Sequence, residues 1–227
     1  MEFEDRVPFV VRLEAEDRQA LLASGDRMVY PARQVLLREH EPSAHVLVLL
    51  SGWTKVTSAA ANGYEALLAL RGPGDIVGEG AALSGRQRSA TVTALGEVEA
   101  LAVEGERFHA LLDERPGVAK KLLALVSDRI RDSDRRRVQF AALNVQERLA
   151  LLLLELIRSH GQETAEGVHL NPGLTQSELA GSVGASREAV ARLLKGLRDR
   201  GIVRTERRGL VVIRPEVLRM MARQGQR

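Results

Sequence analysis

Short apolar runs broken by turn residues fill the chain between residues 29 and 103. The runs QVLLRE, AHVLVLLSG, WTKVTS, YEALLALRG, SATVTAL and VEALAVEG recur at the spacing of short strands joined by turns. An Asn-Gly pair within ANGYE, residues 61–65, lies between two of these runs, and this dipeptide favours a tight β-hairpin. The pattern predicts a small antiparallel β-roll or barrel.

Helical patterns precede and follow these runs. Residues 1–25 are expected to form short helical turns, and residues 105–143 are helical again, with Pro116 where a new helix can begin. A helix of about 26 residues with a narrow apolar stripe is long for a small domain, so pairing with a second copy is expected, and packing on its own domain alone is the alternative. A polar gap over residues 132–137 interrupts the stripe, which consists of Val118, Leu122, Leu125, Val126, Ile130, Phe140 and Leu143.

Residues 175–201 divide into two short helices joined by a glycine turn. Thr175, followed three residues later by Glu178, forms a capping box that begins the first helix. Gly184 permits the left-handed backbone that ends this helix, and Ser186 caps a second helix that stops at Gly201. Such a pair is a helix-turn-helix, whose second helix enters the major groove of DNA. Before it we expect a helix over residues 145–159 and a loop over residues 160–173.

The second helix of this motif is expected to have an inner and an outer face. Its outer face carries Arg187, Glu188 and Arg192. An arginine can pair with guanine and a glutamate can accept from cytosine, so these side chains are candidates for base reading. The alternative is a helical hairpin with a solvated charged face. The apolar residues expected to meet across the turn are Leu179, Val183, Val190 and Leu193.

A basic hairpin follows the two helices. The stretch RTERRGLVV predicts a wing whose arginines lie on DNA phosphates, where they position the protein without reading the sequence. These arginines are Arg204, Arg207 and Arg208. The other residues that we place on the DNA-facing surface are Thr175, Gln176, Ser186 and Lys195.

Charge supports a polyanionic partner for the C-terminal region. The chain has 33 basic and 30 acidic residues, and those from Asn144 onward include 14 basic and 9 acidic ones. The C-terminal third is therefore basic on a slightly acidic body, which favours contact with nucleic acid. A merely solvated basic surface is the alternative.

Composition excludes several other classes of protein. The chain has no cysteine, which excludes disulfides, thiolate metal sites and cysteine-ligated clusters. Its five histidines are scattered without metal-ligand spacing. No apolar run reaches the roughly 18 residues of a membrane span, and the first residues lack the pattern of a signal peptide. We expect a cytoplasmic protein without a metal or a membrane partner.

The stretch GEGAALSGRQRSATV, residues 78–92, is rich in small residues that let a ligand approach the backbone. Glu79 lies near one end of it and Arg88 near the other. This pair of charges can flank a bound ligand. A salt bridge between Arg88 and Glu79 across the roll is the alternative.

A roll of short strands, a long helix and a winged helix-turn-helix, in this order, resemble the Crp/Fnr family of bacterial transcription regulators, and within it the cyclic AMP receptor proteins. The resemblance covers nearly the whole chain. In the family, a phosphate-binding cassette pairs Gly-Glu with a later Arg-Ser-Ala, and a recognition helix opens Ser-Arg-Glu with an arginine one turn on. The matching residues here are Gly78, Glu79, Arg88, Ser89, Ala90, Ser186, Arg187, Glu188 and Arg192.

The resemblance implies that the cassette binds a 3′,5′-cyclic nucleotide, with cyclic AMP as the first candidate. Arg88 can meet the single negative charge of a cyclic phosphate with a charge-assisted fork. The Ser89 hydroxyl and nearby N–H groups add donors. Glu79 can only accept hydrogen bonds, which suits a ribose 2′-OH.

By the same resemblance, the polar gap of the long helix receives the base. Ser133 matches the adenine-contacting hydroxyl, Asp134 the next position, which reaches the ligand of the other subunit, and Arg129 faces the ribose or Glu79. Asp134 can accept from the adenine amino group or from N1–H and N2 of guanine, so cyclic GMP stays open. Gly80, which we place in the pocket, stands where the family has a bulkier apolar residue.

We therefore predict an α+β protein with three parts. These are a cyclic-nucleotide-binding β-roll over residues 1–115, a dimerisation helix over residues 116–143 and a winged helix-turn-helix over residues 144–227. The expected partners are a palindromic DNA duplex, a second copy of the chain and RNA polymerase. No set of nucleophile, base and orienting group is present, so we expect no enzyme. The alternatives are a family member that binds no nucleotide, and a cyclic-nucleotide-binding module that acts on a protein partner.

Overall fold

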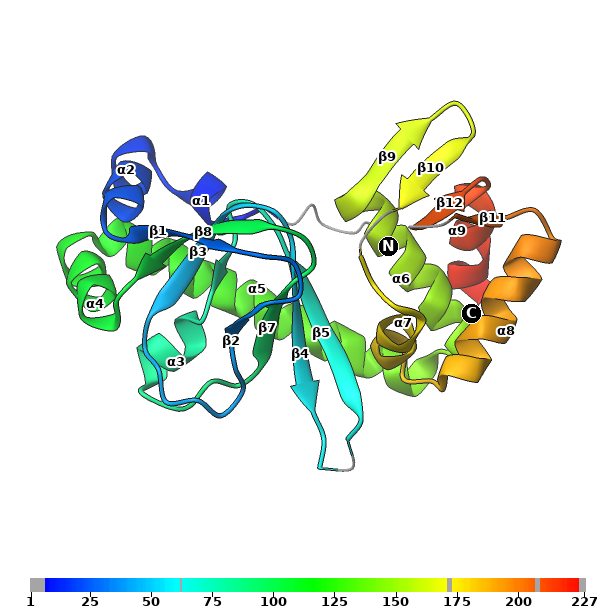
Figure 1. Cartoon of the computed structure of the whole chain (residues 1–227), viewed down its shortest axis with the longest axis horizontal. Helices are drawn as coiled ribbons and strands as arrows, with labels where there is room; N and C mark the ends of the chain where they lie inside the picture. The colour runs from blue at the N-terminus through cyan, green and yellow to red at the C-terminus, as the bar shows by residue number, and fades with distance from the viewer. Residues whose placement is uncertain (1–6, 62, 171–172, 207–208, 225–227) are drawn as a thin grey trace. The chain divides into compact units, whose positions relative to one another are not determined.

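The computed structural model describes residues 7–61, 63–170, 173–206 and 209–224 (Figure 1). The chain forms two compact units, one of Met1–Ala59 and Leu68–Arg131, the other of Ala60–Leu67 and Asp132–Arg227. Helices and antiparallel sheets occur together, which confirms the predicted α+β class.

Two four-stranded sheets form the predicted β-roll. All six runs that the sequence indicated as strands lie in these sheets. Asn62 of the predicted hairpin turn lies outside the described residues, but the strands on either side of it are neighbours in one sheet. The first sheet has the order β1 (Asp26–Tyr30), β8 (Val98–Val103), β3 (Val46–Ser51), β6 (Ile76–Val77), and the second β2 (Val35–Leu37), β7 (Thr91–Ala94), β4 (Thr54–Ala59), β5 (Glu65–Arg71).

Strand β3 separates two hydrophobic cores. Its residues Val46, Leu47, Val48 and Leu49 are all fully buried. Because side chains alternate across a strand, Val46 and Val48 join one core, whereas Leu47 and Leu49 join another between the sheets. The first core is completed by residues of the helices α1 (Phe9–Arg12), α2 (Ala15–Ala23), α4 (Gly105–Glu114) and α5 (Pro116–Ala142).

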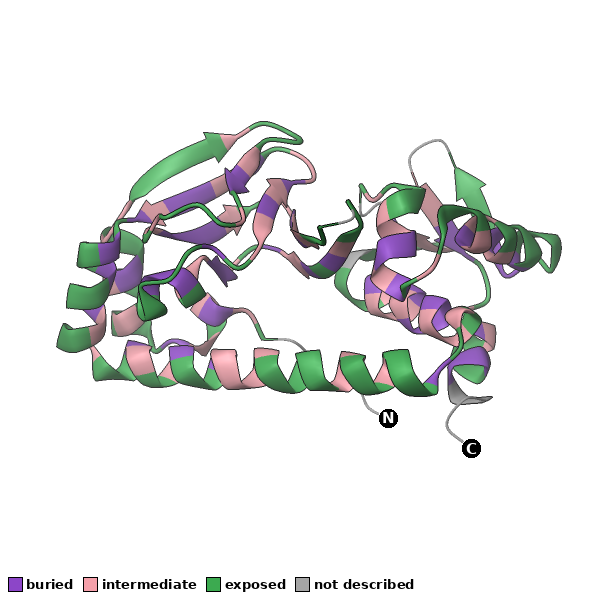
Figure 2. Cartoon of the chain, turned by 90° about the horizontal axis from the view of Figure 1, so that it is seen from below, coloured by how far each residue is buried: buried purple, intermediate pink, exposed green. Residues whose placement is uncertain are grey.

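The predicted long helix is α5. Its buried residues, Val118, Leu122 and Leu125, lie in its first half, at a spacing that forms one helical stripe. Over residues 126–142 no side chain is buried, and Figure 2 shows this half of the helix as exposed or half-buried. Part of the apolar stripe that the sequence indicated is thus uncovered in the single chain.

The second unit contains the predicted helix-turn-helix, which is supported by helix α6 (Val145–His160). A capping box begins α6, because Asn144 Oδ1 accepts from the Glu147 amide at 3.1 Å while the Glu147 carboxylate accepts from the Asn144 amide at 2.8 Å. The apolar face of this helix is buried, through Leu149, Leu153 and Leu156.

Two elements of this unit differ from the sequence prediction. The expected loop over residues 160–173 contains a hairpin, β9 (Gly161–Thr164) with β10 (Gly167–Leu170). It joins the wing strands in a sheet of order β11-β12-β10-β9, because Val168, His169 and Leu170 pair with β12. An unpredicted helix, α9 (Pro215–Gln224), follows the wing and buries Leu218 and Met221 in the core of the unit.

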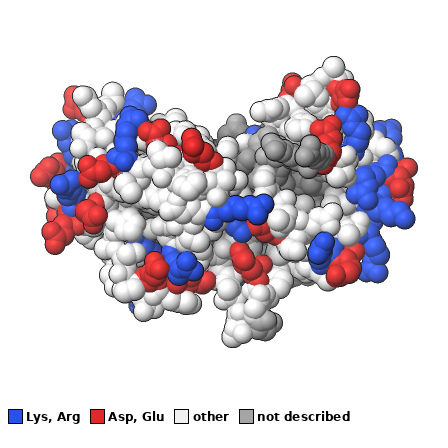
Figure 3. All heavy atoms as spheres, viewed as in Figure 1, with Lys and Arg blue, Asp and Glu red and all other residues white. Residues whose placement is uncertain are grey.

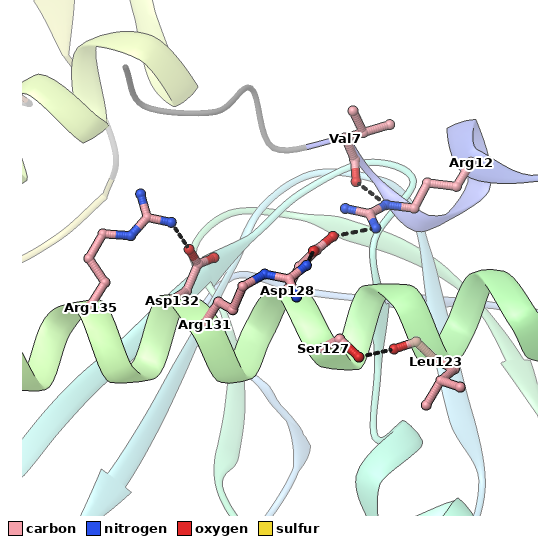
Figure 4. A network of polar contacts seen from close by, with 8 residues as sticks. All are labelled: Val7, Arg12, Leu123, Ser127, Asp128, Arg131, Asp132 and Arg135. Carbon is pink, nitrogen blue, oxygen red and sulfur yellow. Dashed lines mark hydrogen bonds and ion pairs between the residues drawn. The ribbon is translucent and has the colours of Figure 1, made fainter. Parts of the chain in front are cut away.

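A polar network fastens the N-terminal residues to α5 (Figure 4). Arg12 donates from Nη1 to Asp128 Oδ2 at 2.6 Å and from Nε to the Val7 carbonyl at 3.0 Å. Asp128 also accepts from Arg131, three residues later on the same helix. The hydrogen bond from Arg12 is the main cause that lowers the pKa of Asp128 below its usual value. The bridge thus contributes stability while Asp128 is ionised.

We predict that Arg12→Met lowers the free energy of unfolding by about 0.5 kcal/mol at pH 7, since the bridge is partly exposed. The contribution is complete above the unfolded-state pKa of Asp128, near 4, and is lost as the pH falls through its lower folded-state pKa. Urea unfolding at pH 7 and about pH 3 should show the difference shrinking in acid. Arg18→Met, an exposed change on α2, is the control. An equal loss at both pH values would contradict the ion-pair explanation.

Candidate functional site

A short cassette connects β6 to β7 in the first unit. Gly78 follows β6 with φ +87°, and helix α3 (Glu79–Ser84) begins directly after it. A Cβ at Gly78 would lie 2.7 Å from Arg88 Nη1 and 3.1 Å from the His45 carbonyl oxygen. A glycine is therefore required at position 78 for two reasons, the left-handed backbone and the close approach of Arg88.

The Arg88 side chain is buried, with 3% of the residue exposed. Its Nη1 donates to the Gly78 carbonyl at 2.7 Å and its Nη2 to the His45 carbonyl at 2.5 Å. Its Nε donates to Ser43 Oγ at 2.9 Å. Burial lowers the pKa of Arg88, and no carboxylate among the described residues forms an ion pair with it. A buried cation with only neutral acceptors is a suitable site for an anion.

Glu79 is paired with Arg129 of α5 and not with Arg88, so the salt bridge considered as an alternative is absent from the described residues. Arg129 also donates from Nη2 to the Ile76 carbonyl at 2.7 Å. Its Nε–H is buried without a hydrogen-bond partner in the described part of the chain. Helix α5 thus places a second guanidinium, with an unused donor, beside the cassette, and a ligand oxygen could satisfy that donor.

Three further cassette residues, Gly80, Ser89 and Ala90, are at least partly exposed, whereas Ala81 and Ala82 are buried. Ser89 is exposed and Ala90 is half-buried, directly before β7. A Cβ added at Gly80 would meet no atom within 4 Å, so the space beside it is open. Ligand atoms can therefore approach the backbone at Gly80 without displacing another side chain.

Ser133 and Asp134 are exposed on α5, beginning one helical turn after Arg129. Asp134 lies 3.6 Å from Arg137 in an ion pair whose two side chains are 60% and 80% exposed. Such an exposed pair is weak, so Asp134 can exchange Arg137 for another donor.

The predicted helix-turn-helix is present in the second unit. Helix α7 (Gln176–Val183) begins with the expected capping box, in which Thr175 Oγ1 accepts from the Glu178 amide at 3.2 Å. Gly184 ends it with φ +59°. Ser186 then caps α8 (Arg187–Asp199) by accepting from the Ala189 amide at 3.2 Å. Each local signal thus produces the element that it predicts.

Helix α8 presents a charged face. Arg187, Glu188, Arg192 and Lys195 are exposed, and Figure 3 shows Lys and Arg side chains gathered over α8. The pKa of Glu188 is lowered, first by its own backbone N–H and then by Ser186, so its carboxylate is ionised at neutral pH. Thr175, Gln176 and Ser186 are exposed as well.

The inner face of α8 differs by one position from the prediction. Leu194 is buried, whereas Leu193 is only half-buried, and Leu179 on α7 is half-buried too. The buried residues Val190, Leu194 and Leu197 follow an i, i+4, i+7 pattern, which turns the apolar stripe slightly from the expected one.

Arg148 of α6 holds the end of the first helix of the motif. It donates from Nε to the Val183 carbonyl at 2.8 Å. Its guanidinium also lies 5.0 Å from the centre of the Phe140 ring, a cation–π distance. A Cβ at Gly184 would lie 2.6 Å from the same ring. The turn is therefore packed against the last residues of α5.

The wing consists of β11 (Val203–Glu206) and β12 (Gly209–Val212). Arg204, predicted to lie on phosphates, donates to Glu206 Oε1 at 3.0 Å and also to Glu166 of the β9–β10 turn. These two carboxylates raise the pKa of Arg204 and neutralise its charge locally. Arg207 and Arg208 lie outside the described residues.

Neither a metal site nor a membrane-spanning helix is found in the described part of the chain. Among the described residues, no three His, Asp or Glu side chains gather as a metal site would require. In the same part of the chain, no helix combines the length and the apolarity needed to cross a membrane.

Comparisons with known proteins agree with this geometry. Residues 27–115 match the cyclic nucleotide-binding domain family, and residues 147–221 match the Crp-like helix-turn-helix domain family. The chain is 29% identical over 194 residues to the CRP-like cAMP-activated global transcriptional regulator of Mycobacterium tuberculosis, covering 86% of this chain and 87% of that one. It is 30% identical over 197 residues to the cyclic AMP receptor protein of Thermus thermophilus, covering 87% and 88%.

A solved structure supports the same fold. The c-di-GMP responsive global regulator CLP of Xanthomonas campestris superposes with a TM-score of 0.76 at 25% identity, covering 88% of this chain and 99% of that one.

We predict that Gly78→Ala costs more stability than Gly85→Ala. Both glycines have positive φ, but a Cβ at Gly85 would meet no atom within 4 Å. Gly85→Ala should cost about 1 kcal/mol of unfolding free energy from backbone strain. Gly78→Ala should cost roughly 1–3 kcal/mol more, because it displaces the buried Arg88 from its acceptors. Urea unfolding measures both, and equal losses would show that Arg88 does not depend on Gly78.

Proposed function

Because the chain belongs to the Crp/Fnr family of DNA-binding transcription regulators, we propose that it is a homodimer whose binding to DNA is controlled by a 3′,5′-cyclic nucleotide, with cyclic AMP as the first candidate. The observation that carries the proposal is the buried guanidinium of Arg88, which lacks a carboxylate partner among the described residues and lies in a cassette of small residues. The ligand of a cyclic nucleotide-binding domain contains a cyclic phosphate, whose negative charge would pair with the positive charge of Arg88.

In this proposal the cassette binds the phosphate at one end and the sugar at the other. Arg88 and Ser89 hold the phosphate, with Gly78, Gly80 and Ala90 allowing it to approach the backbone. Glu79, an acceptor already oriented by Arg129, receives the ribose 2′-OH.

Ser133 and Asp134 are proposed to meet the base. Their exposure on α5 leaves both side chains available for a ligand. The two relatives named for cAMP favour adenine, whereas an aspartate at position 134 can also bind guanine. The choice between cyclic AMP and cyclic GMP therefore depends on this pair of residues.

A second copy of the chain is the proposed partner of α5. Leu123, Ile130 and Val138 are 68%, 57% and 65% exposed. They lie seven and eight residues apart, close to a heptad spacing, so two parallel helices can bury them together. A parallel pair would present two copies of α8 to half-sites of a palindrome about 34 Å apart.

On DNA, the exposed face of α8 is proposed to read bases. Arg187, Glu188 and Arg192 reach base edges, since the first residues of a recognition helix enter the major groove. The residues that complete the proposed DNA surface are Thr175, Gln176, Ser186, Lys195, Arg207 and Arg208. RNA polymerase is the further partner that we expect of such a regulator, which would then act in the cytoplasm.

Titration calorimetry with cyclic AMP and cyclic GMP tests the effector. We expect one site per subunit with micromolar or tighter affinity for one of the two. Arg88→Ala should reduce the affinity at least a hundredfold, since it removes a buried charge-assisted fork worth about 3 kcal/mol. Arg86→Ala, an exposed change in the same loop, should leave it close to the original value. Unchanged affinity in Arg88→Ala would contradict the pocket, and no binding of either nucleotide would contradict nucleotide control.

Binding to a palindromic duplex tests base reading. Arg187→Ala should reduce discrimination at one base pair by about 1–3 kcal/mol, because a bidentate contact to a base is lost. Lys195→Ala should instead weaken binding to all sequences alike and flatten the dependence on salt concentration. Both quantities follow from fluorescence anisotropy over a series of salt concentrations. If discrimination at this base pair is unchanged in Arg187→Ala, other residues read the base.

A further inference from the structure

The loop of residues 40–45, between β2 and β3, encloses Arg88. On the main chain, the His40 amide donates to the Arg88 carbonyl at 2.9 Å, and the Arg88 amide donates to the Glu41 carbonyl at 3.2 Å. The same loop supplies two of the three acceptors of the guanidinium, Ser43 Oγ and the His45 carbonyl. The position of Arg88 is therefore set by a segment more than forty residues before it in the sequence.

The Arg88 guanidinium retains two N–H groups for a ligand. A guanidinium has five N–H groups, and three of those of Arg88 are used by Ser43, Gly78 and His45. One N–H remains on Nη1 and one on Nη2. N–H groups on the two terminal nitrogens of one planar guanidinium can bind phosphate oxygens together. The internal hydrogen bonds thus leave one donor on each terminal nitrogen for an anion.

Of the three acceptors, only Ser43 acts through its side chain. The Gly78 and His45 carbonyls are main-chain groups, present whatever residue occupies those positions. Ser43 alone engages Nε, the nitrogen closest to the aliphatic part of the side chain, and with the two carbonyls it fixes the rotation of the guanidinium plane. Replacing it with alanine would leave a buried N–H without a partner, which favours a rotated guanidinium.

We infer that Ser43 is a positioning residue for the recognition of the cyclic phosphate, holding the Arg88 fork in the plane that the phosphate requires. This inference rests on the proposed function, since it takes a cyclic nucleotide as the ligand. It adds a residue outside the cassette to the determinants of binding. A serine hydroxyl suits the role because it is small, accepts from Nε and carries no charge that would compete with the phosphate.

The test compares the two phosphorothioate diastereomers of the preferred cyclic nucleotide, each with sulfur in place of a different exocyclic oxygen. A fixed fork distinguishes the two oxygens, so the unmodified chain should bind one diastereomer more tightly. Ser43→Ala should weaken binding of the unsubstituted nucleotide about tenfold and bring the ratio of the two diastereomers close to one. Ser43→Thr retains a hydroxyl acceptor and should restore the ratio.

If Ser43 only stabilises the fold, Ser43→Ala would weaken the binding of both diastereomers by the same factor and leave the ratio of their affinities unchanged. That result would overturn the inference, as would normal binding by Ser43→Ala or an unmodified chain that does not distinguish the diastereomers. Ser24→Ala, which removes a hydroxyl bonded to the Leu21 carbonyl, controls for loss of a serine elsewhere. An unmodified chain that binds no cyclic nucleotide would overturn the proposed effector together with this inference, whereas the other failures leave the effector in place.

Discussion

The buried charge of Arg88 is the constraint on which the first unit depends. A guanidinium removed from water must be satisfied by oriented acceptors, and here these come from two separate segments of the chain, the 40–45 loop and Gly78. Gly78 has to be a glycine so that Arg88 can approach, and the 40–45 loop has to pass beside it. The neutral acceptors keep the side chain in place without cancelling its charge, so the site retains its attraction for an anion.

A second guanidinium organises the other end of the cassette in a different way. Arg129 belongs to α5, whereas Glu79 begins α3, so their ion pair joins the cassette to the long helix within the first unit. A ligand that hydrogen bonds to Glu79 would change the ion pair that Glu79 forms with Arg129 on α5. In a two-state regulator, a ligand shifts the equilibrium only by binding the two states differently, and this contact is one place where the difference can arise.

The sequence predicts most reliably where the physical cause is local. The capping box of Thr175 and Glu178, and the glycine turn at Gly184, act within a few residues, and both appear as predicted. The β9–β10 hairpin was not predicted because β9 is exposed throughout and has no apolar alternation. The role of Ser43 has no signature in the sequence either, since it arises from a contact that only the folded roll creates. Helix α9 does have a local signal, because Pro215 stands at its first position, where proline favours a helix start.

Side chains alternate along β3, and the interior of the first unit is therefore divided into two cores. Neighbouring residues of this strand belong to different cores, Val46 and Val48 on the helical side and Leu47 and Leu49 between the sheets. Substitutions at Val46 or Val48 would therefore change the packing against the helices first, and substitutions at Leu47 or Leu49 the packing between the sheets. One short strand thus transmits a change in either core to the backbone that both cores share.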